Sequence, residues 1–372
     1  MKKFIFISFI ISIIATSSQA TEVEYTYSGE WSSFYGYTFP HHNHKHKDKR
    51  QFFVNTFNLN LGAEKTFNNE TSLGVYVDLM AGIDKRQYNY SNGLWGHEIY
   101  TIFDNPYGRI MLGETYNVAS QFHISAPKAG KFGLNDSDIV NFIANPNWIK
   151  EKHLTAYRTL NSTAINTDGT AAKISYITPE YENLTLGLSY VPDTYSRTGL
   201  VNRDARYADN DGYVVSAYYN TDLRFAELES SLGYAIFNKD DHDISLGLSL
   251  YKSGWTIGGS WRKTYIDGND YPITQDNTNN RLLSLFDNYR EGSAWDIGIG
   301  YEIGPYKVAL SYFESKAKNT DNKDQIWLLS NEFQLDKNIK FYLAGAHANF
   351  KGVTFDDSNK GYSAITGFSI SF

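Results

Sequence analysis

The sequence predicts an all-β protein that crosses a membrane as a closed antiparallel barrel of sixteen strands. Three observations lead to this fold class. The chain opens with the pattern of an export leader, its apolar and small polar residues alternate with a period of two, and aromatic residues make up 16% of a chain without cysteine. Tyrosine and tryptophan favour the boundary of a bilayer, and a closed barrel is held together by its hydrogen-bond ladder rather than by disulfides.

The first twenty residues have the layout of a secretory signal peptide. Lys2 and Lys3 precede an almost unbroken apolar stretch, residues 4–15, and Ser18 and Ala20 place small residues where a signal peptidase reads them. Such a segment is too short for an anchored membrane span, although a retained N-terminal anchor helix is the alternative. We therefore expect a cleaved signal peptide over residues 1–20 and a barrel over residues 21–372.

Segments of about ten residues alternate in polarity, as strands with one apolar face do. In residues 183–191, for example, Leu184, Leu186, Leu188 and Tyr190 alternate with Thr185, Gly187 and Ser189. Successive side chains in a strand point to opposite faces, so one face is apolar and the other small and polar. A soluble sandwich would need bulky residues on its inner face, whereas a small polar face suits a wide, water-filled barrel.

Sixteen such segments can be traced along the chain, and an even number places both termini on the periplasmic side. They are residues 24–38, 51–64, 71–82, 97–104, 108–116, 170–178, 183–191, 212–222, 225–237, 243–252, 254–265, 293–303, 306–316, 324–335, 339–349 and 361–372.

The connections between these segments fall into two classes. Tight turns such as Asn105–Gly108 alternate with longer polar stretches such as 192–211 and 266–292, which is the pattern of short periplasmic turns and long external loops. The longest connection, residues 117–169, lies between the fifth and sixth segments. A connection of this length needs a functional explanation.

Three motifs are informative together: Tyr107–Gly113, the pair Ala172–Pro179 and Leu184–Pro192, and the last residue, Phe372. They resemble the Gram-negative general porin family, particularly its alphaproteobacterial type. Tyr107–Gly113 resembles that family's fifth strand, and Ala172–Pro179 with Leu184–Pro192 resembles the two strands after its third loop. The chain also ends on an aromatic residue, Phe372, like barrels whose last residue the outer-membrane assembly machinery recognises. The resemblance covers essentially the whole mature chain. It implies a homotrimer of sixteen-stranded barrels, each with loop 117–169 folded into the lumen as a constriction.

The resemblance further implies passive diffusion of small hydrophilic solutes and ions across the bacterial outer membrane, without a cofactor. The expected partners are these solutes, outer-membrane lipid, lipopolysaccharide and the assembly machinery. The net charge of −7 argues against a nucleic acid. One residue departs from the family pattern: Glu114 stands where a basic residue commonly follows the Leu-Gly of the fifth strand, so the family's charge layout need not carry over.

Selectivity in such a pore depends on its width and on the fixed charges at its narrowest part. The charged residues expected there lie in the long connection or on strands facing it, and the alternative is that they are solvated on an external loop. They are Arg109, Glu114, Lys128, Lys131, Asp136, Asp138, Arg158 and Lys173. Residues 137–149 are expected to form a short helix that pins the connection to the wall. Further inward acids, Asp78, Glu227, Glu229 and Asp296, favour a weak cation preference.

A histidine-rich stretch offers a weaker hypothesis of metal binding. His41, His42, His44 and His46 could hold Zn²⁺ or Cu²⁺ through imidazole nitrogens, but neighbouring lysines would oppose a cation. An exposed basic loop that contacts lipopolysaccharide is the favoured interpretation.

Two other functions share the predicted fold. A solute-specific channel could stack a sugar on Trp148 and Tyr157, and a non-transporting adhesin or receptor could use its external loops. An enzyme is not expected, because His123 and His153 have serines nearby but no catalytic signature around them.

Overall fold

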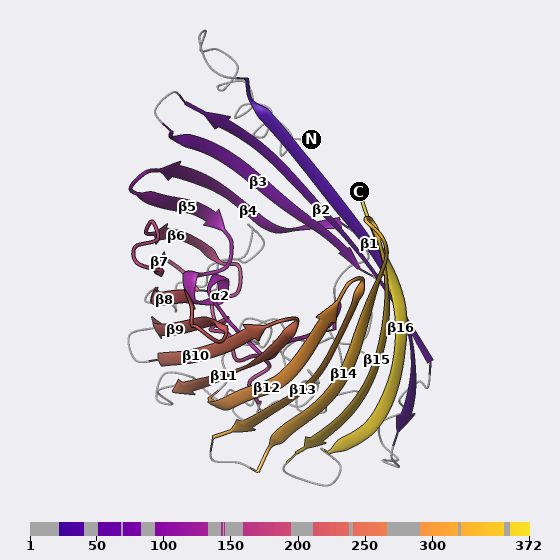
Figure 1. The fold of residues 1–372 in the computed structure, drawn as a ribbon. Helices are drawn as coiled ribbons and strands as arrows, with labels where there is room; N and C mark the ends of the chain where they lie inside the picture. Colours follow the sequence, from indigo (N-terminus) through magenta and orange to yellow (C-terminus); the bar gives the residue numbers. More distant parts are fainter. Residues whose placement is uncertain are drawn as a thin grey trace, which may run out of the picture.

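A closed barrel of antiparallel strands is the architecture of the computed structural model (Figure 1). Each strand pairs with the next along the chain, and the last strand pairs with the first. The structure describes residues 22–40, 51–67, 70–82, 94–132, 143, 145, 159–194, 211–237, 241–265, 291–318, 321–352 and 358–372. The expected signal peptide lies outside these residues, so its cleavage stays a prediction. No helix in the described part of the chain is long and apolar enough to cross a membrane.

The sixteen predicted strands are confirmed, with small shifts at their ends. They are β1 (Glu24–Pro40), β2 (Gln51–Thr66), β3 (Ser72–Gly82), β4 (Leu94–Asn105), β5 (Gly108–Glu114), β6 (Ala172–Ile177), β7 (Leu184–Val191), β8 (Gly212–Asp222), β9 (Glu227–Phe237), β10 (Asp241–Lys252), β11 (Trp255–Tyr265), β12 (Gly292–Ile303), β13 (Tyr306–Ala317), β14 (Lys323–Asp336), β15 (Ile339–Lys351) and β16 (Asn359–Ser371).

Polarity alternation sets which face of each strand turns outward. On β11, Trp255, Ile257 and Trp261 are exposed, while Ser260 and Arg262 on the opposite face are buried. Exposed apolar residues repeat in this way around the barrel and give it an outer surface suited to lipid. The pairing register is fixed accordingly, because a slip of one residue would turn every apolar side chain inward.

The two ends of the chain close the barrel. Gly29 on β1 and the terminal Phe372 exchange two backbone hydrogen bonds, of 2.9 and 3.0 Å. The Phe372 ring lies over Gly29, where a Cβ atom would come within 2.2 Å of it, so the ring would have to move if residue 29 carried a side chain. Phe372 therefore completes the hydrogen-bond ladder, and its role as an assembly signal stays a prediction.

The long connection after β5 begins with one turn of helix, α2 (Val118–Gln121), which sequence reasoning did not predict. Asn117 caps it by accepting a hydrogen bond from the Ser120 amide at 2.9 Å. The helix lies beside β7, β8 and β9, on their small-residue face (Figure 1). Of the helix expected over residues 137–149, only Ile143 and Asn145 are described, and both are buried.

Candidate functional site: the charged interior of the barrel

Three aspartates on alternate strands bind described residues of the long connection to the strands. Asp243 on β10, Asp296 on β12 and Asp324 on β14 are at most 3% exposed. The Asp296 carboxylate accepts hydrogen bonds from the Ala126 amide at 2.8 Å and from the Thr163 hydroxyl at 2.9 Å. It thus joins two parts of the connection to one strand. The expected inward position of Asp296 is correct, but its charge is used in these contacts and is not open to solvent.

Asp243 forms a buried ion pair with Arg262 of the neighbouring strand β11. The guanidinium donates to both carboxylate oxygens, at 3.1 and 2.9 Å, and both side chains are 1% exposed. It also donates to the Ala164 carbonyl and, at 2.7 Å, to the Thr167 hydroxyl. A buried charge pair needs such additional hydrogen bonds to offset its desolvation. The pair therefore holds residues 164–167 to the wall.

The two ends of the long connection are tied to each other by Lys173. Its ammonium group lies 3.1 Å from the Asp168 carboxylate, and both side chains are fully buried. It also donates to the Thr115 carbonyl, and Asn117 donates to Asp168 at 2.6 Å. Lys173 was expected to line the pore, but the structure places it in the base of the connection.

Glycines on the wall allow the connection to come close. A Cβ atom on Gly247 of β10 would lie 2.3 Å from the carbonyl oxygen of Ile124, and one on Gly187 of β7 would lie 2.7 Å from Val118. The small polar face was interpreted as the lining of a water-filled lumen. On β7–β12 it also accommodates residues 118–127, because only small side chains leave room for a second layer of chain.

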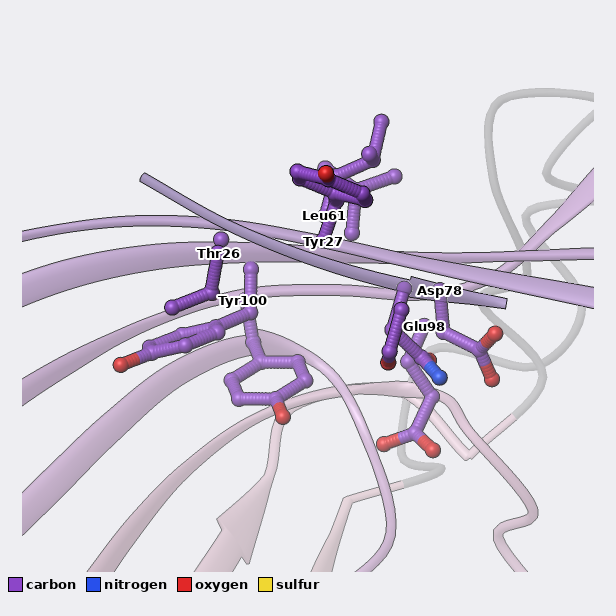
Figure 2. A pocket seen from close by; sticks show the side chains of 11 residues that line it. Thr26, Tyr27, Leu61, Asp78, Glu98 and Tyr100 are labelled. Atoms are coloured by element: carbon purple, nitrogen blue, oxygen red, sulfur yellow. The ribbon is translucent and has the colours of Figure 1, made fainter. Parts of the chain in front are cut away.

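The wall formed by β1–β4 differs from the wall that carries these aspartates, because its acids Glu64, Asp78 and Glu98 remain half-exposed. A hollow of about 260 Å³ is lined there by Thr26, Glu98 and Tyr100, while Tyr27 and Leu61 point to the opposite side of the strands (Figure 2). Nearby, the Tyr76 hydroxyl, which also lines the hollow, donates to Glu64 at 2.6 Å. We call this surface, with its acids Glu64, Asp78 and Glu98, the acidic wall.

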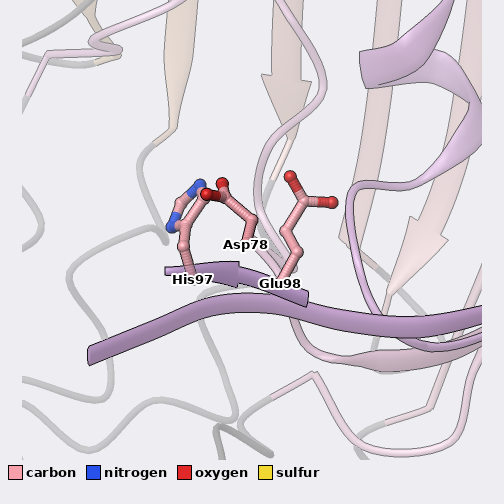
Figure 3. Close-up of side chains that lie close together, drawn as sticks. All are labelled: Asp78, His97 and Glu98. Carbon is pink, nitrogen blue, oxygen red and sulfur yellow. The ribbon is translucent and has the colours of Figure 1, made fainter. Parts of the chain in front are cut away.

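An irregularity in β4 brings three potential ligand groups together on the acidic wall. The register between β3 and β4 shifts after Asp78, which pairs with Glu98, so that His97 is an extra residue. One ligand atom from each of the three side chains lies within 4.8 Å of the other two. Figure 3 shows all three on the same side of the strands. The imidazole Nε2 of His97 contacts the Tyr116 hydroxyl at 3.1 Å, and Thr115 donates to Glu98 at 2.5 Å.

The other expected pore-lining residues have varied positions. Lys128 and Lys131 are exposed, whereas Ala129 and Phe132 beside them are buried, and Lys131 forms an ion pair with Glu30 of β1. Arg109 pairs with Asp104 at 2.8 Å beside the β4–β5 turn. Glu114 is half-buried at the end of β5 and has an interaction partner. Asp136, Asp138, Arg158 and the histidines His41, His42, His44 and His46 lie outside the described residues.

His123 contacts a second segment of the long connection, 40 residues further along the chain. Its Nε2 contacts the Thr163 hydroxyl at 3.1 Å. Burial, and secondarily the positive charge of Arg262, lowers the pKa of His123 to about 4. The imidazole is therefore neutral at physiological pH. No catalytic role is needed to explain it, because the contact itself is structural.

Sequence reasoning missed Arg262, Asp324 and His97. Arg262 carried a usable signal, because it is a large charged residue on the otherwise small polar face of its strand. His97 carried none, because strict alternation places it on the opposite face from Glu98 and a bulge cannot be read from the polarity pattern.

An apolar exterior around a charged interior, in a closed barrel of sixteen antiparallel strands, defines a porin-type channel of the outer membrane. The model of the Gram-negative porin family matches residues 8–353, and the chain belongs to this family. The family and fold are those of channels, so this protein is a channel and not an enzyme. The resemblance noted in the sequence is thereby confirmed.

Solved porin structures share the fold at low sequence identity. An anion-selective porin from Comamonas acidovorans is 15% identical with a TM-score of 0.61, and the match covers 94% of this chain and 100% of that one. A triple mutant of Rhodopseudomonas blastica porin is 11% identical, with a TM-score of 0.55 and the same coverage. OmpT of Vibrio cholerae without loop L8 is 10% identical, with a TM-score of 0.59 over 95% of this chain and 100% of that one. No curated protein matches the sequence.

Proposed function

We propose that the channel lets small hydrophilic solutes and ions diffuse passively, with residues 117–169 forming a constriction in the lumen and cations preferred over anions. The observation that carries the proposal is a group of half-exposed acids on one wall of the barrel, opposite a wall whose charges are buried. Arg262 and Lys173 are buried in ion pairs, whereas Glu64, Asp78 and Glu98 on the acidic wall are half-exposed. Fixed charges act over about 8 Å at physiological salt, so these accessible acids would attract cations.

Contacts of the long connection support the constriction. Between α2 and Phe132, its backbone bonds to Ser231 of β9, Asp296 of β12 and Ser330 of β14. Phe132 then packs on Phe34 of β1 with ring centroids 4.8 Å apart. A segment that contacts the inner face from β9 round to β1 reduces the open cross-section while leaving the acidic wall accessible. The Comamonas porin is anion-selective, and the proposal assigns the opposite preference to this chain.

Reversal potentials in a KCl gradient, with a chelator present, test the proposal. The wild type should be cation-selective, and the triple variant Glu64→Gln/Asp78→Asn/Glu98→Gln should move the reversal potential towards zero. Asp336→Asn is the matched control, because it removes an acid from the exposed β14–β15 turn. An unchanged reversal potential in the triple variant would refute the assignment of selectivity to the acidic wall. A reconstituted barrel without conductance would favour the receptor alternative.

The part of the constriction outside the described residues has its own test. Asp136→Asn/Asp138→Asn should also lower the cation preference if these acids line the narrowest part, as expected from the sequence. Retention of the wild-type reversal potential would remove both residues from the pore lining.

A further inference from the structure

The bulge in β4 assembles an imidazole and two carboxylates that the passage of solutes does not require. Ordinary alternation would place His97 on the lipid-facing side, and the register shift at Asp78 turns it inward beside Glu98. Bulges re-aim side chains in this way at functional sites. The three groups come from two adjacent strands, so the backbone ladder fixes their spacing.

We propose that Asp78, His97 and Glu98 form a binding site for a first-row divalent transition-metal ion such as Zn²⁺. Zinc is bound by imidazole nitrogen and carboxylate oxygen at about 2.0–2.2 Å, which places ligand atoms about 3.3 Å apart in a tetrahedron. The three ligand atoms already lie within 4.8 Å of one another. Side-chain rotations on a fixed backbone can close that difference. The imidazole favours zinc over calcium, which prefers oxygen ligands alone.

Two features of the free cluster favour a cation in it. First, the Oδ1 atom of Asp78 is buried and has no hydrogen-bond partner among the described residues. A buried carboxylate oxygen without a partner is costly, and coordination to a metal is one way to satisfy it. Second, Asp78 and Glu98 bring like charges close together, and a divalent cation between them removes the repulsion.

Outer contacts orient two of the three ligands. The Tyr116 hydroxyl contacts Nε2 of His97, which leaves Nδ1 for the metal, and Thr115 donates to Glu98. Partners of this kind fix ring orientation and carboxylate position in known metal sites. Thr115 and Tyr116 lie between β5 and the long connection, so an ion at this site would also hold the start of that connection to β4.

Calorimetric titration of Zn²⁺ into the purified, chelator-treated full-length barrel tests the site. All proteins tested carry His41, His42, His44 and His46 replaced by glutamine, which removes the competing histidine-rich stretch. We expect one Zn²⁺ per chain. Because loss of even an outer partner of a ligand lowers metal affinity about tenfold or more, His97→Gln and Glu98→Gln, which remove ligands, should lower it by at least that factor. His347→Gln is the matched control, because His347 also lies on a strand against a tyrosine, with ring centroids 4.5 Å apart, and should leave binding unchanged.

Three outcomes would overturn the site: no Zn²⁺ binding to the parent barrel, equal binding by the His97→Gln variant, or loss of binding in the His347→Gln control. Circular dichroism checks that each variant keeps its β-sheet content. The binding readout needs no conductance, so it is independent of the proposed selectivity. A barrel that binds Zn²⁺ through these residues but passes anions would refute the proposed cation preference and leave the metal site intact.

Discussion

The two sides of the barrel interior use acidic residues in different ways. On β10, β12 and β14, Asp243, Asp296 and Asp324 are buried under the long connection and accept its hydrogen bonds. On β3 and β4, Asp78 and Glu98 face inward but stay half-exposed. The covered acids act as structural anchors because their charges are paired or hydrogen-bonded away from water. The accessible acids on the other side can act on ions.

The largest expected effect comes from breaking the anchor at Arg262. Asp243→Ala leaves the guanidinium buried without its carboxylate, and such changes cost about 3–5 kcal/mol. Asp104→Ala is the control, because its ion pair with Arg109 is exposed and should contribute less than about 1 kcal/mol. Free energies of unfolding from urea titrations in detergent give both values. Equal losses in the two variants would contradict the distinction between a buried anchor and an exposed pair.

A somewhat smaller effect is expected from the pH dependence of His123. Its pKa is lowered from 6.5 to about 4, so the folded state binds fewer protons than the unfolded state between these values. The contribution to stability is complete above pH 6.5, declines as the pH falls, and is lost below pH 4. The difference amounts to about 3 kcal/mol.

Unfolding at pH 7 and pH 4.5 measures this effect. The wild type should lose more stability on acidification than His123→Gln, which carries no titrating ring. His242→Gln, at an exposed position, should behave like the wild type. If His123→Gln and wild type lose the same stability between the two pH values, the buried contact with Thr163 does not govern the acid response.

The strands of this fold were predictable from the sequence because one physical pattern repeats in each of them. Lipid on one side and water or a second layer of chain on the other impose a period of two, which locates all sixteen strands. The ends are less well determined, because pairing continues beyond the apolar stretch. β4, for example, begins at Leu94 rather than at residue 97.

The interior was less predictable, because alternation gives the face of a residue and not what covers it. Asp78 and Asp296 have the same pattern in sequence, yet only Asp296 is covered by the long connection. Lys173 is buried in an ion pair with Asp168, which belongs to a connection whose path no local pattern determines. The bulge at His97 was also unpredictable from local sequence, because it depends on how β3 and β4 pair.

The smallest expected effect comes from a substitution that pushes the long connection away from strand β10. In Gly247→Ala the added Cβ would meet the Ile124 carbonyl oxygen at 2.3 Å, so the connection must move away from β10. Overpacking of this kind costs about 1–3 kcal/mol. Gly345→Ala is the control, because no atom lies within 4 Å of the added methyl group. A connection pushed off the wall would narrow the opening and lower the single-channel conductance of Gly247→Ala alone. Lost stability with wild-type conductance would mean that residues 118–127 cover the wall without setting the width of the pore.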